Sequence, residues 1–259
     1  MDYFNYLFVE SGDPRVYSWP LMQSPLGIFA IIIIYLCTVL KWGPDFMKNR
    51  RPFDLKLLIA AYNFSMIFMC CWIIYSYHEI GLRISTFLSC INMDFAVTPI
   101  SMRTLHISWY VMMSKVIELV DTVFFVLRKK QKQVSVLHVY HHASTLFLCW
   151  LAVKYVGTGM ALFSIILNAF VHVLMYSYYF LSIFQRLQHR LRPIKPYITV
   201  IQMVQFSMIL VQICITVIYD CTLPKAILAM YFPNVIVIFY MFYKFFKRTY
   251  VPESNKVKK

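Results

Sequence analysis

Long apolar runs separated by short, basic segments dominate the pattern of this chain. Seven of these runs are roughly 20 residues long, the length that an α-helix needs to cross a bilayer. They cover residues 25–41, 57–80, 106–127, 134–153, 159–184, 197–219 and 225–243. With 60% hydrophobic and 14% charged residues, the composition differs from that of a soluble globular domain. The pattern therefore predicts an all-α, polytopic membrane protein with a single seven-span domain, residues 1–243.

The basic residues indicate how this domain is oriented. The net charge is +14, and Lys and Arg gather on one side of the expected spans, nineteen against five on the other. Under the positive-inside rule, the richer side is cytosolic. We therefore expect residues 1–24 to lie in a lumen and residues 244–259 to form a basic, disordered cytosolic tail. We interpret the charge as a sign of topology, and we expect no binding of nucleic acid.

Only two of the seven cysteines fall in loops, and both of these loops lie on the expected luminal side. They are Cys90 and Cys221, whereas the other five lie within spans. A disulfide persists in an oxidising lumen. We therefore expect Cys90 and Cys221 to be joined.

Polar side chains recur at helical spacing within four of the spans. The stripes consist of Lys115, Glu118 and Asp121 in the third span, His138, His141 and His142 in the fourth, Asn168 and His172 in the fifth, and Gln202 and Gln205 in the sixth. Positions three or four apart share one helix face, and an ionisable group inside a bilayer must pair or line a wet cavity. At about 1.5 Å per residue, all four stripes reach the cytosolic half or the middle of the membrane. We expect one pocket that opens to the cytosol and ends blindly among apolar side chains, which suits a molecule with a charged head and an alkyl tail.

The histidine triplet allows three interpretations. A di-iron membrane desaturase or hydroxylase also uses His-x-x-His-His, but such a site needs more histidines than the few that can converge here. A seven-span lipid receptor or transporter is the non-enzymatic alternative, although a cytosolic pocket faces away from an extracellular ligand. Acyl transfer is the third, because a neutral imidazole attacks thioesters and the acyl-imidazole remains reactive. The residues favour acyl chemistry without a metal, and the other two interpretations stay open.

Four motifs follow one another along the spans. They are Lys115-x-x-Glu118-x-x-Asp121-Thr122, Leu137-His138-Val139-Tyr140-His141-His142, Asn168-x-x-x-His172-x-x-Met175-Tyr176-x-Tyr178-Tyr179 and Thr199-x-x-Gln202-x-x-Gln205. In order and spacing they resemble the very-long-chain fatty acid elongases, the condensing enzymes of animal membranes. The resemblance implies residence in the endoplasmic reticulum and a ring of helices around a narrow acyl tunnel. It implies condensation of acyl-CoA with malonyl-CoA to 3-ketoacyl-CoA, CO2 and CoA, the first step of fatty acid elongation, without a further cofactor.

On this resemblance we expect an acyl-histidine intermediate on His141. The remaining stripe residues would support it. They are His138 and His142 as orienting or proton-relay groups, Glu118 and Asp121 behind them, Asn168 and His172 at the malonyl group or the oxyanion, and Lys115, Gln202 and Gln205 in the shared pocket.

Basic residues at the cytosolic mouth would hold the phosphates of CoA. The candidates for this rim are Arg128, Lys129, Arg192, Lys195, Lys244 and Lys247. We expect membrane lipid and the reductases and dehydratase of the elongation cycle as further partners, and a homodimer stays open.

Overall fold

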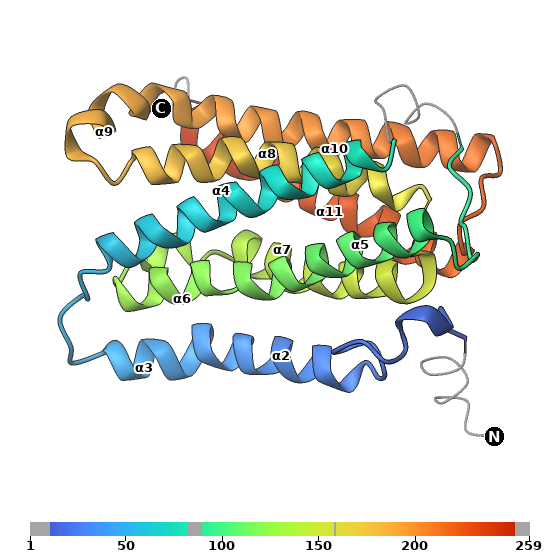
Figure 1. The fold of residues 1–259 in the computed structure, drawn as a ribbon. Coiled ribbons are helices and arrows are strands. Elements are labelled where there is room, and N and C mark those ends of the chain that lie inside the picture. The colour runs from blue at the N-terminus through green and yellow to red at the C-terminus, as the bar shows by residue number, and fades with distance from the viewer. Residues whose placement is uncertain (1–10, 82–89, 158, 252–259) are drawn as a thin grey trace, which may run out of the picture.

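The computed structural model describes residues 11–81, 90–157 and 159–251. Over these ranges the chain is helical and has no β-strand. The long helices lie side by side, and the connecting segments gather at the two ends of the bundle (Figure 1). The prediction of an all-α protein is confirmed.

The helices are α2 (Leu26–Cys37), α3 (Gly43–Met47), α4 (Lys56–Glu79), α5 (Pro99–Glu118), α6 (Val120–Leu127), α7 (Val136–Leu151), α8 (Ala161–Leu181), α9 (Gln185–Leu191), α10 (Lys195–Ile218) and α11 (Lys225–Tyr250). Two π-helical segments extend this set: η3 (Thr38–Trp42) joins α2 to α3, and η6 (Ala152–Val156) continues α7. Short 3-10 turns are η2 (Pro14–Val16), η5 (Gln131–Gln133) and η7 (Arg192–Ile194).

Six stretches of the described chain are long and apolar enough to cross a membrane. They are Leu26–Met47, Lys56–Glu79, Val136–Val156, Ala161–Leu181, Gln185–Ile218 and Lys225–Tyr250. The expected third span is present as α5 and α6, which meet at Leu119. It is divided into helices of 20 and 8 residues, and it holds the charged residues Lys115, Glu118 and Asp121. The protein is therefore a multi-pass membrane protein, and a seventh crossing stays a prediction.

The last helix is longer than expected, which corrects the boundary of the predicted tail. The span was expected to end at residue 243, whereas α11 continues to Tyr250. Lys244 and Lys247 therefore lie on the final turns of a helix and not in a disordered segment. Val251 is extended, as is usual for a residue before proline. Residues 252–259 of the predicted tail, and residues 1–10, lie outside the described residues.

Local sequence determines where two of the functional helices begin. The hydroxyl of Ser135 accepts a hydrogen bond from the His138 backbone N–H at 3.2 Å, and Thr98 accepts one from Ser101 at 3.1 Å. Such side chains satisfy backbone donors that a helix start leaves unpaired. The cap at Ser135 places the histidine triplet in the first two turns of α7.

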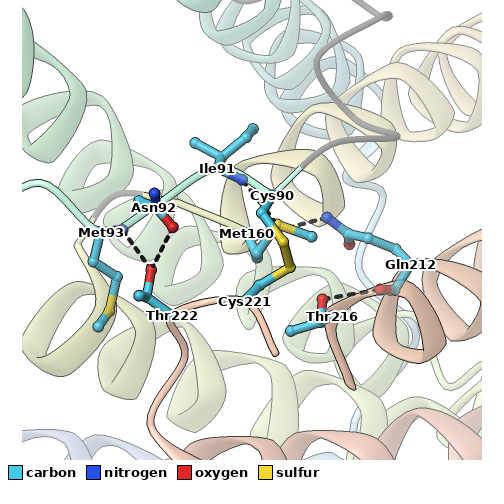
Figure 2. The surroundings of a disulfide bond; sticks show 9 residues. All are labelled: Cys90, Ile91, Asn92, Met93, Met160, Gln212, Thr216, Cys221 and Thr222. Carbon is cyan, nitrogen blue, oxygen red and sulfur yellow. Dashed lines mark hydrogen bonds between the residues drawn. A yellow bond between two sulfur atoms is a disulfide. The ribbon is translucent and has the colours of Figure 1, made fainter. Parts of the chain in front are cut away.

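The N-terminal segment and a disulfide cover one end of the bundle. Val16 and Met22 are fully buried there, and Nζ of Lys154 donates to the Met22 carbonyl at 2.8 Å. The structure joins Cys90 to Cys221, the two cysteines that the sequence analysis pairs (Figure 2). The disulfide thus connects the segment before α5 with the segment after α10.

Loss of this disulfide should lower the stability of the fold. The bond links cysteines 131 residues apart, and loop-closure entropy assigns up to about 5 kcal/mol to a loop of that size. We expect Cys90→Ser and Cys221→Ser to lower the melting temperature in detergent by several degrees. Cys71→Ser, which removes an exposed free thiol, is the control. Peptide mapping with and without reductant checks the bond, and two free thiols in the native chain would refute it.

Candidate active site

A cavity of about 150 Å³ runs between five helices. Side chains of α5, α7, α8, α10 and α11 line it, and within the described chain α2 and α4 contribute no lining residue. The helix α2 packs against α7, and α4 packs against α8. The ring around the cavity is therefore smaller than the predicted ring of seven helices.

One end of this cavity is polar and the rest is mostly apolar. Lys115, His141, Asn168 and Gln205 line the polar end, and Thr145 lies one turn beyond His141. Further along α10 the lining includes the apolar side chains of Phe206, Ile209 and Ile213, and it reaches Thr216 at the opposite end, near the disulfide. Four of the ten predicted catalytic residues thus line the same cavity.

Lys115 is the centre of the polar end. Its ammonium donates to both carboxylate oxygens of Glu118, at 2.8 and 3.1 Å, and to Oδ1 of Asn168 at 2.7 Å. Nδ1 of His172 lies 3.3 Å from Oε1 of Glu118. Lys115, Glu118 and His172 are 7%, 1% and 5% exposed. A buried charge pair is tolerable only when such bonds satisfy its remaining donors and acceptors, so this cluster forms a rigid wall of the site.

The three histidines of the triplet differ in position. His141 lines the cavity, whereas His138 and His142 lie outside its lining among the described residues. The ring centroids of His138 and His142 are 4.3 Å apart, and those of His141 and His142 are 5.5 Å apart with perpendicular rings. His138 also contacts Thr122, whose Oγ1 lies 3.0 Å from Nε2. The geometry therefore presents His141 to the cavity and places the other two imidazoles behind it.

Of the six predicted catalytic residues that do not line the cavity in the described chain, Asp121 and Gln202 make their contacts elsewhere. Asp121 accepts a hydrogen bond from the hydroxyl of Tyr176 at 2.9 Å, and the ring of Tyr62 packs edge-on against Tyr176. Nε2 of Gln202 lies 3.6 Å from Sδ of Met175. Gln202 is three residues from Gln205, yet only Gln205 reaches the cavity.

The six predicted rim residues also lie outside the cavity lining of the described chain. Figure 1 places α3, α6 and α9 at the same end of the bundle. Arg128 and Lys129 follow α6, and Nζ of Lys129 donates to the Lys48 carbonyl at 3.3 Å. Arg192 and Lys195 follow α9, and Lys244 and Lys247 lie in the last turns of α11. All except Arg128 are exposed.

Hydrogen bonds and the disulfide hold the opposite end of the cavity in place. Nε2 of Gln212 donates to the Met160 carbonyl at 2.8 Å, and Oγ1 of Thr216 donates to the Gln212 carbonyl at 2.9 Å. The backbone N–H of Ile91 lies 3.3 Å from Sδ of Met160. Figure 2 shows these residues beside the cross-link at Cys221.

The sequence analysis missed the contacts of three side chains, of which two bond predicted site residues and the third bonds one of those two. Thr122 and Tyr176 stand in the motifs, but spacing alone did not assign them the contacts with His138 and Asp121. Tyr35 contacts Thr122 from α2. The sequence does set Tyr35 apart, because it is the single hydroxyl-bearing residue of the apolar run LGIFAIIIIYLC.

These observations define a class of protein: an all-α, multi-pass membrane protein whose buried lysine, acid and histidine side chains meet at one end of an apolar cavity. The family model described as ELO, the GNS1/SUR4 family, matches residues 20–258. The chain therefore belongs to the ELO (GNS1/SUR4) family.

Three curated relatives show the extent of the similarity. Very long chain fatty acid elongase 4 of Mus musculus is 36% identical over 250 residues, which cover 96% of this chain and 80% of the relative. Elongase 4 of Homo sapiens is 37% identical over 240 residues, 92% of this chain and 76% of the relative. Elongase 1 of Mus musculus is 39% identical over 201 residues, 78% of this chain and 72% of the relative.

Proposed function

We propose that the protein condenses a long-chain acyl-CoA with malonyl-CoA to give 3-ketoacyl-CoA, CO2 and CoA. Membership of the ELO family and relatives named as very long chain fatty acid elongases support this function. The structural observation that carries it is the single cavity in which His141, Lys115 and Asn168 meet an apolar channel. Such a space accommodates an alkyl chain with its thioester at the polar end.

The first step is transfer of the acyl group to His141. A ring nitrogen of neutral His141 attacks the thioester carbonyl, the C–S bond breaks, and CoA leaves as the thiol with the proton that the imidazole gives up. The ammonium of Lys115 and the amide of Asn168 line the same end of the cavity. Donors at that position stabilise the negative charge that develops on the carbonyl oxygen.

The second step forms the carbon–carbon bond. Malonyl-CoA loses CO2, and the resulting enolate attacks the acyl-imidazole carbonyl. The C–N bond breaks, 3-ketoacyl-CoA leaves, and the imidazolide nitrogen takes one proton from water, which regenerates neutral His141. No electrons are exchanged with an external carrier, so the two CoA thioesters suffice as reactants. Reductases and a dehydratase must then act on the 3-keto product to complete one round of elongation.

The proposal also places the protein in its membrane. We expect residence in the endoplasmic reticulum, with the N-terminus in the lumen and the C-terminus in the cytosol. The disulfide supports an oxidising compartment at its end of the bundle. The excess of Lys and Arg supports cytosol at the other end, where some of the six rim residues would bind the phosphates of CoA.

The function is tested in membranes that contain the expressed chain, with labelled malonyl-CoA and a panel of acyl-CoAs. We expect label in 3-ketoacyl-CoA, with membranes that lack the chain as the blank. Label that stays in malonyl-CoA across the whole panel would refute the proposed function.

A larger side chain inside the cavity should shorten the products. Ile209 and Ile213 are buried on α10, line the cavity and lie one turn, about 6 Å, apart. We expect Ile213→Trp to lower the longest product and Ile209→Trp, nearer the polar end, to lower it further. Val211→Trp is the matched control, because Val211 is 59% exposed on the same helix. Mass spectrometry of the products measures the change, and equal product lengths in all three variants would contradict an acyl chain in this cavity.

A further inference from the structure

A chain of hydrogen bonds reaches the histidine triplet from outside the cavity. The phenol oxygen of Tyr35 on α2 lies 2.9 Å from Oγ1 of Thr122 on α6, and the same Oγ1 lies 3.0 Å from Nε2 of His138 on α7. Tyr35 is 4% exposed and Thr122 is 0% exposed. Helix α2 thus meets the consecutive helices α6 and α7 at one hydroxyl group that is shielded from water.

Tyr35 stands out in its own helix. Its neighbours Ile33 and Ile34 are 59% and 56% exposed on the outer face of α2, whereas Tyr35 points inward and is buried. A buried hydroxyl is costly unless it is hydrogen-bonded. The contact with Thr122 meets that need and fixes which face of α2 packs on the bundle, although α2 contributes nothing to the cavity lining of the described chain.

The partners determine the direction of the chain. Thr122 has one proton, so its hydroxyl can donate to only one of its two neighbours, and if it accepted from both, its own proton would be left unpaired. If it donated to Tyr35, the phenol proton would lack an acceptor, since Tyr35 has no other hydrogen bond within the described residues. An unpaired buried donor is unfavourable. The direction that satisfies both hydroxyl groups runs from Tyr35 to Thr122 and from Thr122 to Nε2 of His138.

This direction selects one form of His138. A neutral imidazole carries a proton on one nitrogen, and the hydrogen bond at the other nitrogen decides which. Because Nε2 accepts from Thr122, the proton lies on Nδ1. The His138 ring then packs against His142, with centroids 4.3 Å apart, and His142 packs against His141, which lines the cavity.

We infer that Tyr35 and Thr122 are positioning residues that hold His138 as the Nδ1–H tautomer and thereby fix the ring of His142 behind His141. The inference rests on the proposed function for its kinetic consequence, but not for the tautomer itself. Neither residue lines the cavity in the described chain, so both act through His138 and do not bind substrate.

Nitrogen NMR of the full chain in lipid bilayers, labelled with 15N-histidine, tests the tautomer directly. The His138 signals are assigned by their loss in His138→Gln. We expect Nε2 to be unprotonated and Nδ1 protonated in the native chain, the same form in Thr122→Ser, and a loss of this preference in Thr122→Val. A protonated Nε2 in the native chain overturns the inference, even if no variant can be purified.

Kinetics provide the second arm. We expect Tyr35→Phe to lower kcat by about threefold to tenfold, the effect of one hydrogen bond, with KM for acyl-CoA unchanged. Thr122→Val should lower kcat by roughly tenfold or more, and Thr122→Ser should restore it. Unchanged kcat in both Tyr35→Phe and Thr122→Val, or a change confined to KM, overturns the positioning role. Absence of condensation in the native chain would refute the proposed function and leave the tautomer test intact.

Tyr77→Phe is the matched control for loss of a buried phenol. Tyr77 is 1% exposed, and its hydroxyl lies 3.1 Å from Oγ of Ser108, away from the histidine triplet. We expect the nitrogen signals of His138 to stay unchanged in this variant. A tautomer change in Tyr77→Phe equal to that in Thr122→Val would show a general response to packing and overturn the specific role of the chain.

Discussion

Replacement of His141 by alanine should reduce condensation by roughly 10³-fold or more, the scale on which enzymes lose activity when a nucleophile is removed. His141 is the imidazole that lines the cavity beside Lys115 and Asn168. Without its ring nitrogen, no acyl-imidazole forms and the thioester has no acceptor at the polar end. The melting temperature of this variant should stay close to that of the native chain, because His141 is only partly buried. Initial rates with labelled malonyl-CoA at saturating acyl-CoA measure the effect.

His78→Ala is the control for the loss of an imidazole. His78 lies at the end of α4 and is exposed, outside the cavity lining. The His78→Ala variant should retain the native rate of condensation. If His141→Ala kept more than a tenth of the native rate in a folded preparation, His141 would not be the nucleophile. The ring packing of His138 and His142 behind it would then need another explanation.

Glu118→Gln should cause the second large effect, a loss of both stability and activity. The substitution leaves the buried ammonium of Lys115 without its counter-ion, which costs about 3–5 kcal/mol when one partner of a buried pair is removed. Without the carboxylate of Glu118, the ammonium of Lys115 is no longer held in place beside Asn168. A misplacement of about 1 Å at a reacting centre costs on the order of 10²-fold in rate. Thermal melting and initial rates measure the two effects separately.

A double variant separates the loss of stability from the loss of catalytic activity. In Lys115→Met/Glu118→Gln no unpaired charge remains, so much of the melting temperature should return while activity stays low. Asp54→Asn is the matched control, because its pair with Lys56 is 3.6 Å long and exposed, and such pairs contribute little. If the double variant melted no higher than Glu118→Gln, the buried charge would not be the source of the instability.

The membrane architecture could be predicted from the sequence because length and hydropathy determine a spanning helix almost by themselves. The boundary of α11 could not, since basic residues interrupt the apolar run after residue 243 while the helix continues to Tyr250. Hydropathy marks the end of an apolar run, but it does not mark the residue at which the hydrogen bonds of the helix end. The expected third span is also absent from the six apolar stretches, because α5 carries the buried charges Lys115 and Glu118 and α6 is only 8 residues long.

Helical spacing predicted the candidate site residues but could not decide which of them line the same cavity. Gln202 and Gln205 are three apart, yet the rotation of α10 brings only Gln205 into the cavity. Asp121 continues the stripe of Glu118 but bonds Tyr176 instead. These outcomes depend on how the helices rotate against one another, which long-range packing sets. The contact of Tyr35 with Thr122 joins positions 87 residues apart and depends on that same packing.

Acylation of the purified chain provides the most direct test of acyl chemistry on His141. Intact mass is measured after incubation with a long-chain acyl-CoA alone and again after malonyl-CoA is added. We expect a mass gain of one acyl group that peptide mapping places on His141 and that disappears as 3-ketoacyl-CoA forms. Normal turnover without any acyl adduct would contradict the covalent mechanism and indicate direct reaction of the two CoA thioesters in a ternary complex.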